Sequence, residues 1–453
     1  MTISRRTLLT TASAALLLPA VARAQGQEQG QGQEQPQPAI LFQNVRLFDG
    51  ISGALRPASL LVRGDKIAEV SDGAIIPPDG ARVIDGGNRV LMPGLIDAHW
   101  HMVFAPNTME NMVAADTGLM YAYAVAEAER TLMRGFTTIR DTGGPTFGLK
   151  QAIDADGIPG PRVFPSGALV SQTAGHGDFG AAYERPVSLG GRTSRYEDIG
   201  AFAIANGVPE VEAAVRLQFK RGASQCKIAM GGGVISDSDP IDTLQYTPDE
   251  ITAAVNVARD WGTYICAHVY TDEGIRRAVD NGVMSIEHGH IASPETLARM
   301  AEKGVWLSIQ PFEAGDNPLT PEQMAKAEPT SHWDKVAAAA RDAGTRVAFG
   351  TDLLFSPDTT DLQSDLFVRF GQVFGNAGTL MIGTSGNADL MQMSGERNPY
   401  KDAALGVLKP GAWADMLLVD GDPTQDLAVL TDHGRNLAMI MKNGKLYKDT
   451  LPA

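Results

Sequence analysis

Short alternating apolar segments lie at both ends of the chain. Near the start they occupy residues 40–48 and 59–70, and near the end residues 414–420 and 438–447 show the same pattern. Asn443-Gly444 joins two of these runs, which is a strong hairpin signal. Neither end is long enough to build a robust core alone. We therefore expect residues 39–90 and 401–453 to form one small composite β-sandwich domain.

The middle of the chain, residues 91–400, alternates apolar β-like runs with helical stretches. Continuous apolar runs such as Tyr264–Ala267 are typical of parallel strands that are buried on both faces. Eight such runs are expected to end near His99, Asp141, Ser166, Lys227, His268, His288, Gln310 and Asp352. Eight strand–helix units are what a (β/α)8 TIM barrel requires, so we predict the α/β class with this barrel.

The first 38 residues have a different composition. Arg5 and Arg6 precede a short apolar stretch, and Ala22-Arg23-Ala24 resembles a cleavage site, so we predict a signal peptide over residues 1–24. The apolar stretch is too short to span a bilayer, which argues against a stable membrane anchor. The arginine pair favours the twin-arginine route over the general route and predicts a periplasmic or secreted protein. Residues 25–38 are almost wholly Gln, Gly, Glu and Pro and are expected to be a disordered spacer.

Charge narrows the range of partners. The net charge is −15 and the isoelectric point is about 5.0, which makes nucleic acid and anionic lipid improbable ligands. Only two cysteines are present, so no disulfide framework is expected.

The expected strand ends carry metal-binding residue types. His99 and His101 stand two apart on one strand, so both imidazoles share a face and can bind one divalent cation. His268 and His288 end consecutive units and face the same pore, which favours metal binding over a role in the core. Asp352 can bind a metal or cap the next helix. Lys227 could be a solvent-reaching lysine, but a carbamate on its nitrogen would supply two oxygens that bridge two cations.

Together these residues resemble the amidohydrolase superfamily, over about residues 41–447. The likeness rests on the HxH pair, the lysine, the two single histidines, the aspartate and the segment Gly406–Gly411. The subgroup resembles the imidazolonepropionase-like enzymes, including Xaa-Pro dipeptidases and ochratoxin-hydrolysing amidohydrolases. Its markers here are Ile139-Arg140-Asp141, Gly175-His176-Gly177, His268-Val269-Tyr270-Thr271 and Ile286-Glu287-His288-Gly289. One departure is Glu396–Tyr400, which replaces the commoner short linker and affects loop details only.

The resemblance implies a binuclear centre. His99, His101 and Asp352 would hold one ion, His268 and His288 the other, and N6-carboxylated Lys227 and a hydroxide would bridge them; Zn²⁺ is the expected metal. The catalytic residues would be Asp352, Lys227 and His268. Hydroxide attack on a carbonyl, with Asp352 moving the proton to the leaving nitrogen, predicts a metal-dependent amide hydrolase.

Substrate contacts are expected from His176, Tyr270 and His290, which lie in or beside the strand-end loops. These neutral groups suit an N-acyl amino acid or dipeptide-like small molecule that is cleaved at the amide bond to its C-terminal amino acid. Alternatives are a cyclic amide hydrolase resembling imidazolonepropionase, a lactonase or esterase on the same site, a mononuclear deaminase and an inactive binding barrel. The metal content per chain would distinguish three of these alternatives: two ions are expected for the hydrolase, one for the deaminase and none for the binding barrel. The sequence leaves homo-oligomerisation open.

Overall fold

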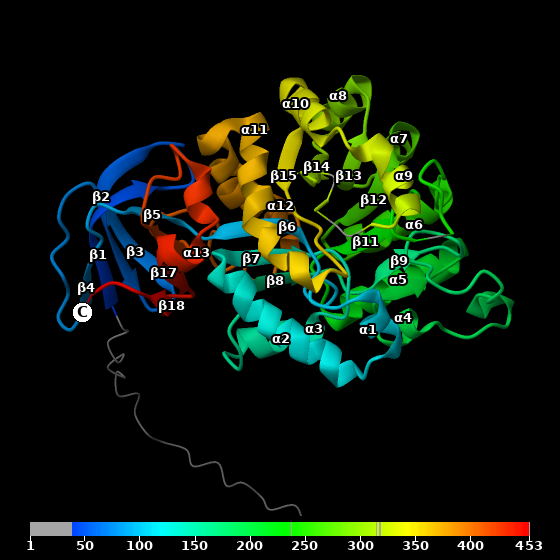
Figure 1. The fold of residues 1–453 in the computed structure, drawn as a ribbon, viewed down its shortest axis with the longest axis horizontal. Coiled ribbons are helices and arrows are strands. Elements are labelled where there is room, and N and C mark those ends of the chain that lie inside the picture. The colour runs from blue at the N-terminus through cyan, green and yellow to red at the C-terminus, as the bar shows by residue number, and fades with distance from the viewer. Residues whose placement is uncertain (1–38, 237, 314, 317–318, 453) are drawn as a thin grey trace, which may run out of the picture. The chain divides into compact units, whose positions relative to one another are not determined.

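The computed structural model describes residues 39–452 except 237, 314, 317 and 318 (Figure 1). The chain divides into two compact units, residues 1–37 and 38–453, and the described residues all belong to the second. The predicted signal peptide, residues 1–24, and the predicted spacer, residues 25–38, lie outside the described residues. Among the helices of the described part, none has the length and apolarity needed to cross a membrane.

Strands from both ends of the chain pair in one sheet. They are β1 (Ala39–Phe48), β2 (Leu55–Arg63), β3 (Lys66–Ser71), β4 (Arg82–Asp85), β5 (Val90–Pro93), β16 (Met416–Val419), β17 (Leu437–Lys442) and β18 (Lys445–Asp449). The order is β18-β17-β16-β5-β1-β2-β3, with β4 also paired to β1. In Figure 1 the first strands, in blue, lie beside the last, in red. The β17–β18 turn has positive φ at Asn443 and Gly444, as a type I′ hairpin needs.

This β region differs in one respect from the expected two-sheet sandwich. The hydrogen bonding is continuous, because β5 pairs with β1 on one side and β16 on the other. The sheet contributes side chains from both ends to a common apolar cluster that includes Phe42, Leu60 and Met439. The two ends of the chain therefore share one continuous sheet and one core, in place of the two packed sheets that we expected.

All eight expected strand regions of the middle segment are present in parallel sheets. A three-stranded sheet contains β6 (Leu95–Trp100), β7 (Phe136–Asp141) and β8 (Arg162–Pro165). A seven-stranded sheet contains β10 (Phe202–Ile204), β9 (Leu169–Ser171), β11 (Cys226–Ala229), β12 (Ile265–Thr271), β13 (Ser285–Ile291), β14 (Trp306–Ile309) and β15 (Arg346–Phe349), in that order. Backbone bonds connect the two sheets at both edges: Thr351 N to His99 O at 3.2 Å, and Ser224 N to Pro165 O at 2.8 Å.

The third expected strand is broken into β8 and β9. Pro165 ends β8, and it has no N–H to continue a ladder. Gly167 then adopts φ +75°, which turns the chain before Leu169 begins β9. We predicted a single strand ending near Ser166, because alternation of residue types does not reveal this kink.

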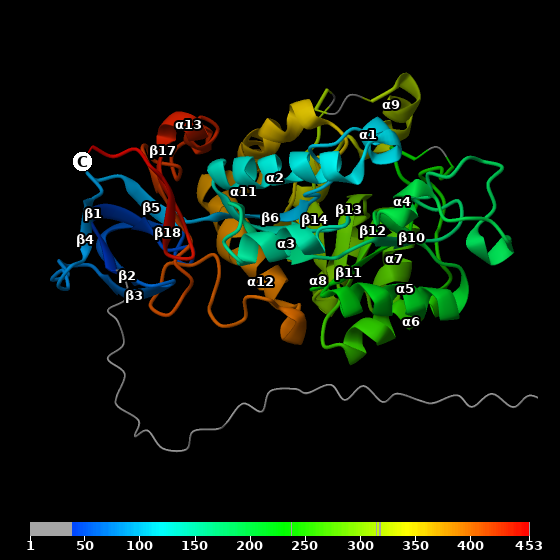
Figure 2. The ribbon, with the colours of Figure 1, turned by 90° about the horizontal axis from the view of Figure 1, so that it is seen from below.

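Helices follow the strands. They are α1 (Met109–Ala114), α2 (Thr117–Met133), α3 (Phe147–Asp154), α4 (Arg195–Asp198), α5 (Gly207–Arg221), α6 (Pro248–Asp260), α7 (Asp272–Asp280), α8 (Pro294–Lys303), α9 (Pro321–Ala327), α10 (Trp333–Ala343), α11 (Gln363–Met381), α12 (Asn387–Gln392) and α13 (His433–Asn436). In Figure 2, α2 and α3 lie on either side of the β6 label, and α5 and α6 lie below β11. Capping residues in the sequence determine where several helices begin. At the N-terminus of α6, for example, Thr247 and Glu250 form a capping box.

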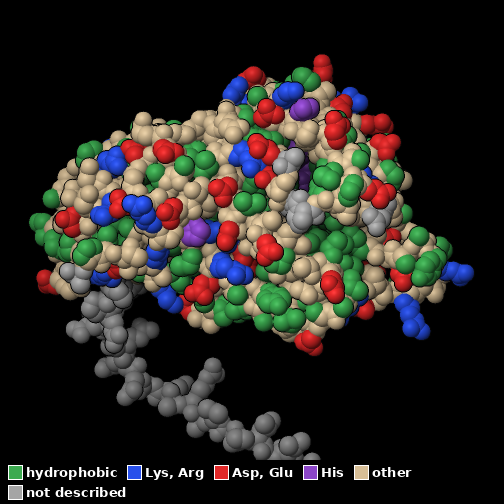
Figure 3. Space-filling view, in the orientation of Figure 1, with side chains coloured by type: hydrophobic (Ala, Val, Ile, Leu, Met, Phe, Trp, Pro, Cys, Tyr) green, Lys and Arg blue, Asp and Glu red, His purple; other side chains and the backbone are tan. Residues whose placement is uncertain are grey.

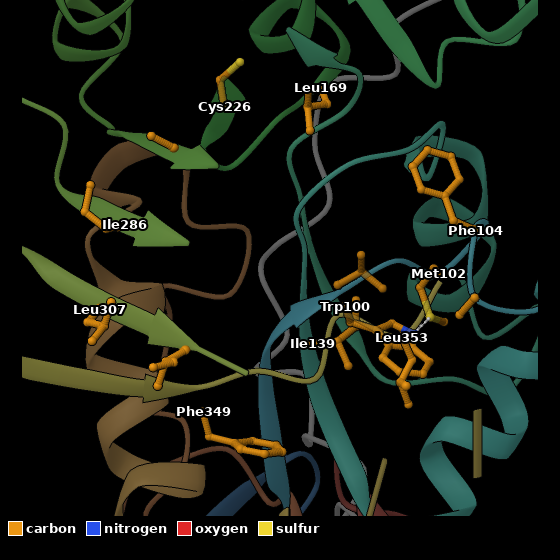
Figure 4. Packing of buried hydrophobic residues seen from close by; sticks show 14 of the residues in the cluster. Trp100, Met102, Phe104, Ile139, Leu169, Cys226, Ile286, Leu307, Phe349 and Leu353 are labelled. Carbon is orange, nitrogen blue, oxygen red and sulfur yellow. Dashed lines mark hydrogen bonds between the residues drawn. The ribbon is translucent and has the colours of Figure 1, made fainter. Parts of the chain in front are cut away.

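The main core lies between the parallel strands and these helices. Ile286, Leu307 and Phe349 come from three successive strands and are fully buried (Figure 4). Trp100 and Ile139 extend the same cluster to β6 and β7. This packing fixes the carboxyl ends of the strands, where the expected chemistry lies.

Candidate metal centre

The HxH pair lies at the end of β6, with His99 and His101 both buried. The next element of the centre comes from the far end of the middle segment: Asp352, after β15, donates its backbone N–H to His99 O at 2.7 Å. One Asp352 carboxylate oxygen, Oδ1, lies 3.1 Å from His99 Nε2 and 2.9 Å from His101 Nε2. One ligand atom from each of these three residues lies within 4.8 Å of the others, so His99, His101 and Asp352 could bind a metal ion.

Three adjacent strands bring the other candidates to the same place. Lys227 is on β11, His268 on β12 and His288 on β13. The Lys227 amine points at the HxH pair, with Nζ 2.9 Å from His99 Nε2. The His288 ring lies 5.1 Å from that of His99 and 4.5 Å from that of His268. The structure therefore gathers all six residues predicted as ligands, with His268 joined to the group through its contact with His288.

In three of the rings one nitrogen faces an oxygen acceptor outside the cluster. His101 Nδ1 lies 2.9 Å from Gly143 O and His288 Nδ1 lies 2.8 Å from Gln310 Oε1. His268 Nε2 lies 3.2 Å from Gly232 O. An N–H on the nitrogen that faces such an oxygen leaves the opposite nitrogen of a neutral His268 or His288 ring with a lone pair, whereas the second nitrogen of His101, Nε2, also faces an oxygen, Asp352 Oδ1, at 2.9 Å.

Burial and charge favour the protonation states that metal binding needs. Burial lowers the pKa of the Lys227 amine and holds the pKa values of His268 and His288 well below their ordinary value. Burial acts to raise the pKa of Asp352, but the nearby His99 and His101 outweigh it and hold that pKa well below its usual range. These shifts favour the unprotonated forms of Lys227, His268 and His288 and the ionised form of Asp352, which are the forms that bind divalent cations.

The three predicted substrate-contact residues line a cavity of about 670 Å³ that opens beside this cluster. His176 stacks on His268, with ring centroids 3.8 Å apart, and Tyr270 stacks on His288 at 4.8 Å. His290 Nε2 lies 3.0 Å from Gln310 O, and burial lowers the pKa of His290 to about 4. In Figure 3 a histidine surface is visible inside a recess on this face.

Sequence reasoning missed two groups at this cavity. Four rings form what we call the phenylalanine wall, namely Phe104, Phe179, Phe202 and Phe355. Their ring centroids lie 5.2 to 6.4 Å apart in successive pairs. The second group fixes His176: its Nδ1 lies 3.0 Å from Ser236 Oγ and 3.2 Å from Asp239 Oδ2. Apart from Phe202, which begins β10, these residues come from loops, whose paths no periodicity in the sequence reveals.

Comparison with known proteins agrees with this geometry. A model of the amidohydrolase family matches residues 90–447. Aspergillus niger ochratoxinase is 33% identical over 422 residues, covering 89% of this chain and 85% of the relative. Its crystal structure has a TM-score of 0.79 and covers 92% of this chain and 96% of that one, with 28% identity.

Two peptidase structures are also similar. A prolidase complexed with N-methylphosphonate-L-proline has a TM-score of 0.82 and 32% identity, covering 91% of this chain and 100% of that one. A Xaa-Pro dipeptidase with methionine bound in its active site has a TM-score of 0.77 and 27% identity, covering 90% and 100%. These matches confirm the resemblance drawn from the sequence motifs.

Proposed function

Because this chain belongs to the amidohydrolase family and is a hydrolase acting on amide bonds, we propose that it is a binuclear enzyme for N-acyl amino acids or dipeptide-like substrates. It would cleave the amide bond to the C-terminal amino acid. The observation that carries the proposal is the position of Lys227, whose amine lies 2.9 Å from His99 Nε2 among the four histidines.

The family is metal-dependent, and His99, His101 and Asp352 lie close enough together to bind one ion. His99, His101 and Asp352 would hold one, and His268 and His288 the other, with Lys227 bridging them as a carbamate. Burial lowers the pKa of this amine and so favours its neutral form, which is the form that reacts with CO₂. When bound, the cations, with Zn²⁺ expected, lower the pKa of water and polarise the substrate carbonyl.

The chain's own residues then handle the proton and the substrate. Asp352 is ionised and only 9% exposed, so it accepts the proton of the attacking water and returns it to the leaving nitrogen. Tyr270 and His176 line the cavity next to the ligands and orient the substrate's polar groups. The phenylalanine wall shields the apolar part of the acyl group from water.

The substrate class rests on this cavity and on the relatives. The phenylalanine wall, with Leu169 and Leu354, gives the cavity a large apolar surface beside a few polar groups. Among the similar proteins, one is an ochratoxinase and two are prolidase or Xaa-Pro dipeptidase structures. A bulky or aromatic acyl group would fit the apolar cavity, and its attachment to an amino acid agrees with the prolidase and Xaa-Pro dipeptidase relatives.

Two further parts of the proposal concern fold and location. The relatives imply a TIM barrel with an additional domain, and we propose that the backbone bonds from Thr351 to His99 and from Ser224 to Pro165 close the two parallel sheets into the (β/α)8 barrel. We also propose export to the periplasm or medium, because the arginine pair and the following apolar stretch match a twin-arginine signal.

The test measures metal content and turnover in the same preparation. Purified protein loaded with Zn²⁺ is analysed for metal per chain and assayed on N-benzoyl amino acids, Xaa-Pro dipeptides and lactones. We expect two metals and amide hydrolysis. Asp352→Asn should keep much of the metal and lose turnover. One metal per chain, or hydrolysis of lactones alone, would overturn the proposal.

A further inference from the structure

Two residues of the marker motifs that have no role so far, Arg140 and Glu287, meet beside His99. Arg140 is on β7 and Glu287 on β13, and both side chains are fully buried. Arg140 Nη2 donates to both carboxylate oxygens of Glu287 at 2.7 Å. The two strands belong to different sheets, so this ion pair joins the sheets inside the protein.

Glu287 also contacts one of the candidate ligands. Its Oε2 lies 2.8 Å from His99 Nδ1. Arg140 donates to both oxygens of this carboxylate, so Glu287 faces His99 as an ionised acceptor. An ionised carboxylate only accepts hydrogen bonds, so the nitrogen that faces it carries the proton. The lone pair of His99 then lies on Nε2, which points at Lys227 and Asp352.

We propose that Arg140 and Glu287 are positioning residues that hold the His99 imidazole in the tautomer and orientation needed to bind a metal. This inference rests on the proposed function, because it takes His99 as a metal ligand.

The contacts around the pair leave little freedom for another arrangement. Glu287 Oε1 also accepts from Ser285 Oγ at 2.6 Å. Arg140 Nε donates at 2.5 Å to Ala98 O, the carbonyl next to His99 in β6. The same guanidinium therefore orients the carboxylate and anchors the backbone that carries the ligand. Such fully satisfied buried networks are rigid.

A second nitrogen near His99 is consistent with this assignment. Gln310 Nε2 lies 3.2 Å from His99 Nδ1, but it also lies 3.1 Å from Ser308 O, to which it donates. Its partner atom Oε1 accepts from His288 Nδ1. Gln310 thus orients His288 while Glu287 orients His99.

A purely structural ion pair would behave differently from a positioning pair. Replacing a buried ion pair by apolar residues of similar volume is often neutral or stabilising. The double variant Arg140→Met/Glu287→Leu should therefore remain folded, yet it removes the acceptor for His99 Nδ1. If the pair serves only stability, this variant keeps wild-type metal affinity.

The experiment measures Zn²⁺ affinity by competition with a chromophoric chelator, alongside thermal melting. For Glu287→Gln and for the double variant we expect about 10- to 100-fold weaker binding at the tighter site, the usual effect of removing a group that orients a metal-binding histidine. The matched control is Asp415→Asn, because Asp415 forms a buried ion pair with Arg162 at the start of β8, the end of the parallel strands opposite the candidate ligands. It should lower the melting temperature without changing the affinity.

A second measurement reads the tautomer directly. In metal-free protein labelled with ¹⁵N-histidine, the long-range ¹⁵N–¹H correlations of His99 should show the proton on Nδ1, and this pattern should be lost in the double variant. Wild-type affinity in both Glu287 variants, or an Nε2–H tautomer in the wild type, would overturn the inference. Wild-type protein that binds no Zn²⁺ would instead overturn the proposed function, and the tautomer spectra would still decide the positioning role.

Discussion

Phe179→Ala should change which acyl groups the enzyme prefers. Phe179 follows the loop of His176 and is half-buried, with its ring 5.2 Å from Phe202 and 6.4 Å from Phe355. It also lines the cavity. Truncation removes one side of the phenylalanine wall but leaves the residues of the metal centre in place. The effect should therefore fall on substrates with a large apolar acyl group.

The size of the effect follows from the contact that is lost. Covering a whole phenylalanine ring contributes about 1.5–3 kcal/mol. Most of Phe179 is already covered in the free enzyme, so a bound aromatic group adds about 0.5–1 kcal/mol from area and about 0.5–1.5 kcal/mol from ring–ring contact. The sum, about 1–2.5 kcal/mol, corresponds to a roughly 5- to 70-fold loss in kcat/KM.

The assay compares two substrates that differ only in the acyl group. For one amino acid, kcat/KM is measured with the N-benzoyl and the N-acetyl derivative, and the benzoyl-to-acetyl ratio should fall by this factor. Phe374→Ala is the control, because its half-buried ring stacks on Phe370 in α11 and is not among the described residues that line the cavity. An unchanged ratio, or an equal loss on both substrates, would refute the role of the wall.

Four other outcomes are expected. Lys227→Ala should abolish turnover and lower the bound metal per chain; wild-type turnover would exclude a bridging role. Burial lowers the pKa of Lys442 from 10.5 to about 8, so the folded state binds this proton more weakly than the unfolded state. The free energy of unfolding should therefore rise between pH 8 and 10.5, by up to about 3 kcal/mol. In denaturant titrations the Lys442→Met variant should lack that rise, and a pH dependence identical to that of the wild type would exclude Lys442 as its source. Replacing both Arg5 and Arg6 by lysine should retain the precursor in the cytoplasm, as followed by fractionation, whereas normal export would point to the general route. Dialysis against a chelator should abolish activity, while circular dichroism of the metal-free protein should still show a cooperative thermal transition. Loss of that cooperative transition would mean that the fold depends on the metal.

The sequence allowed the strand ends and their chemistry to be predicted, because buried parallel strands have a recognisable apolar pattern and chemistry in such folds lies where they end. His99, Lys227 and His288 were located in this way, and the structure brings them together. What surrounds them was not predictable. The contact of Arg140 with Glu287 spans 147 positions, and no local pattern connects them.

Loops account for the remaining differences. Asp239 reaches His176 from a loop after β11, and Phe355 joins the phenylalanine wall from the loop after β15. The break between β8 and β9 likewise depends on the local conformation of Pro165 and Gly167. Periodicity describes regular elements only, so the residues that shape the substrate cavity are the ones it misses.

The ligands themselves show how the fold sets up the site. His288 has φ 76° and Asp352 has φ 52°, in the left-handed region that non-glycine residues rarely adopt. Each costs on the order of 1–3 kcal/mol and persists only where the surroundings determine it. The Asp352 backbone is held by its bond to His99 O, and the His288 ring by Gln310. The buried strands beneath maintain these two conformations, so the fold itself holds His288 and Asp352 at the proposed metal centre.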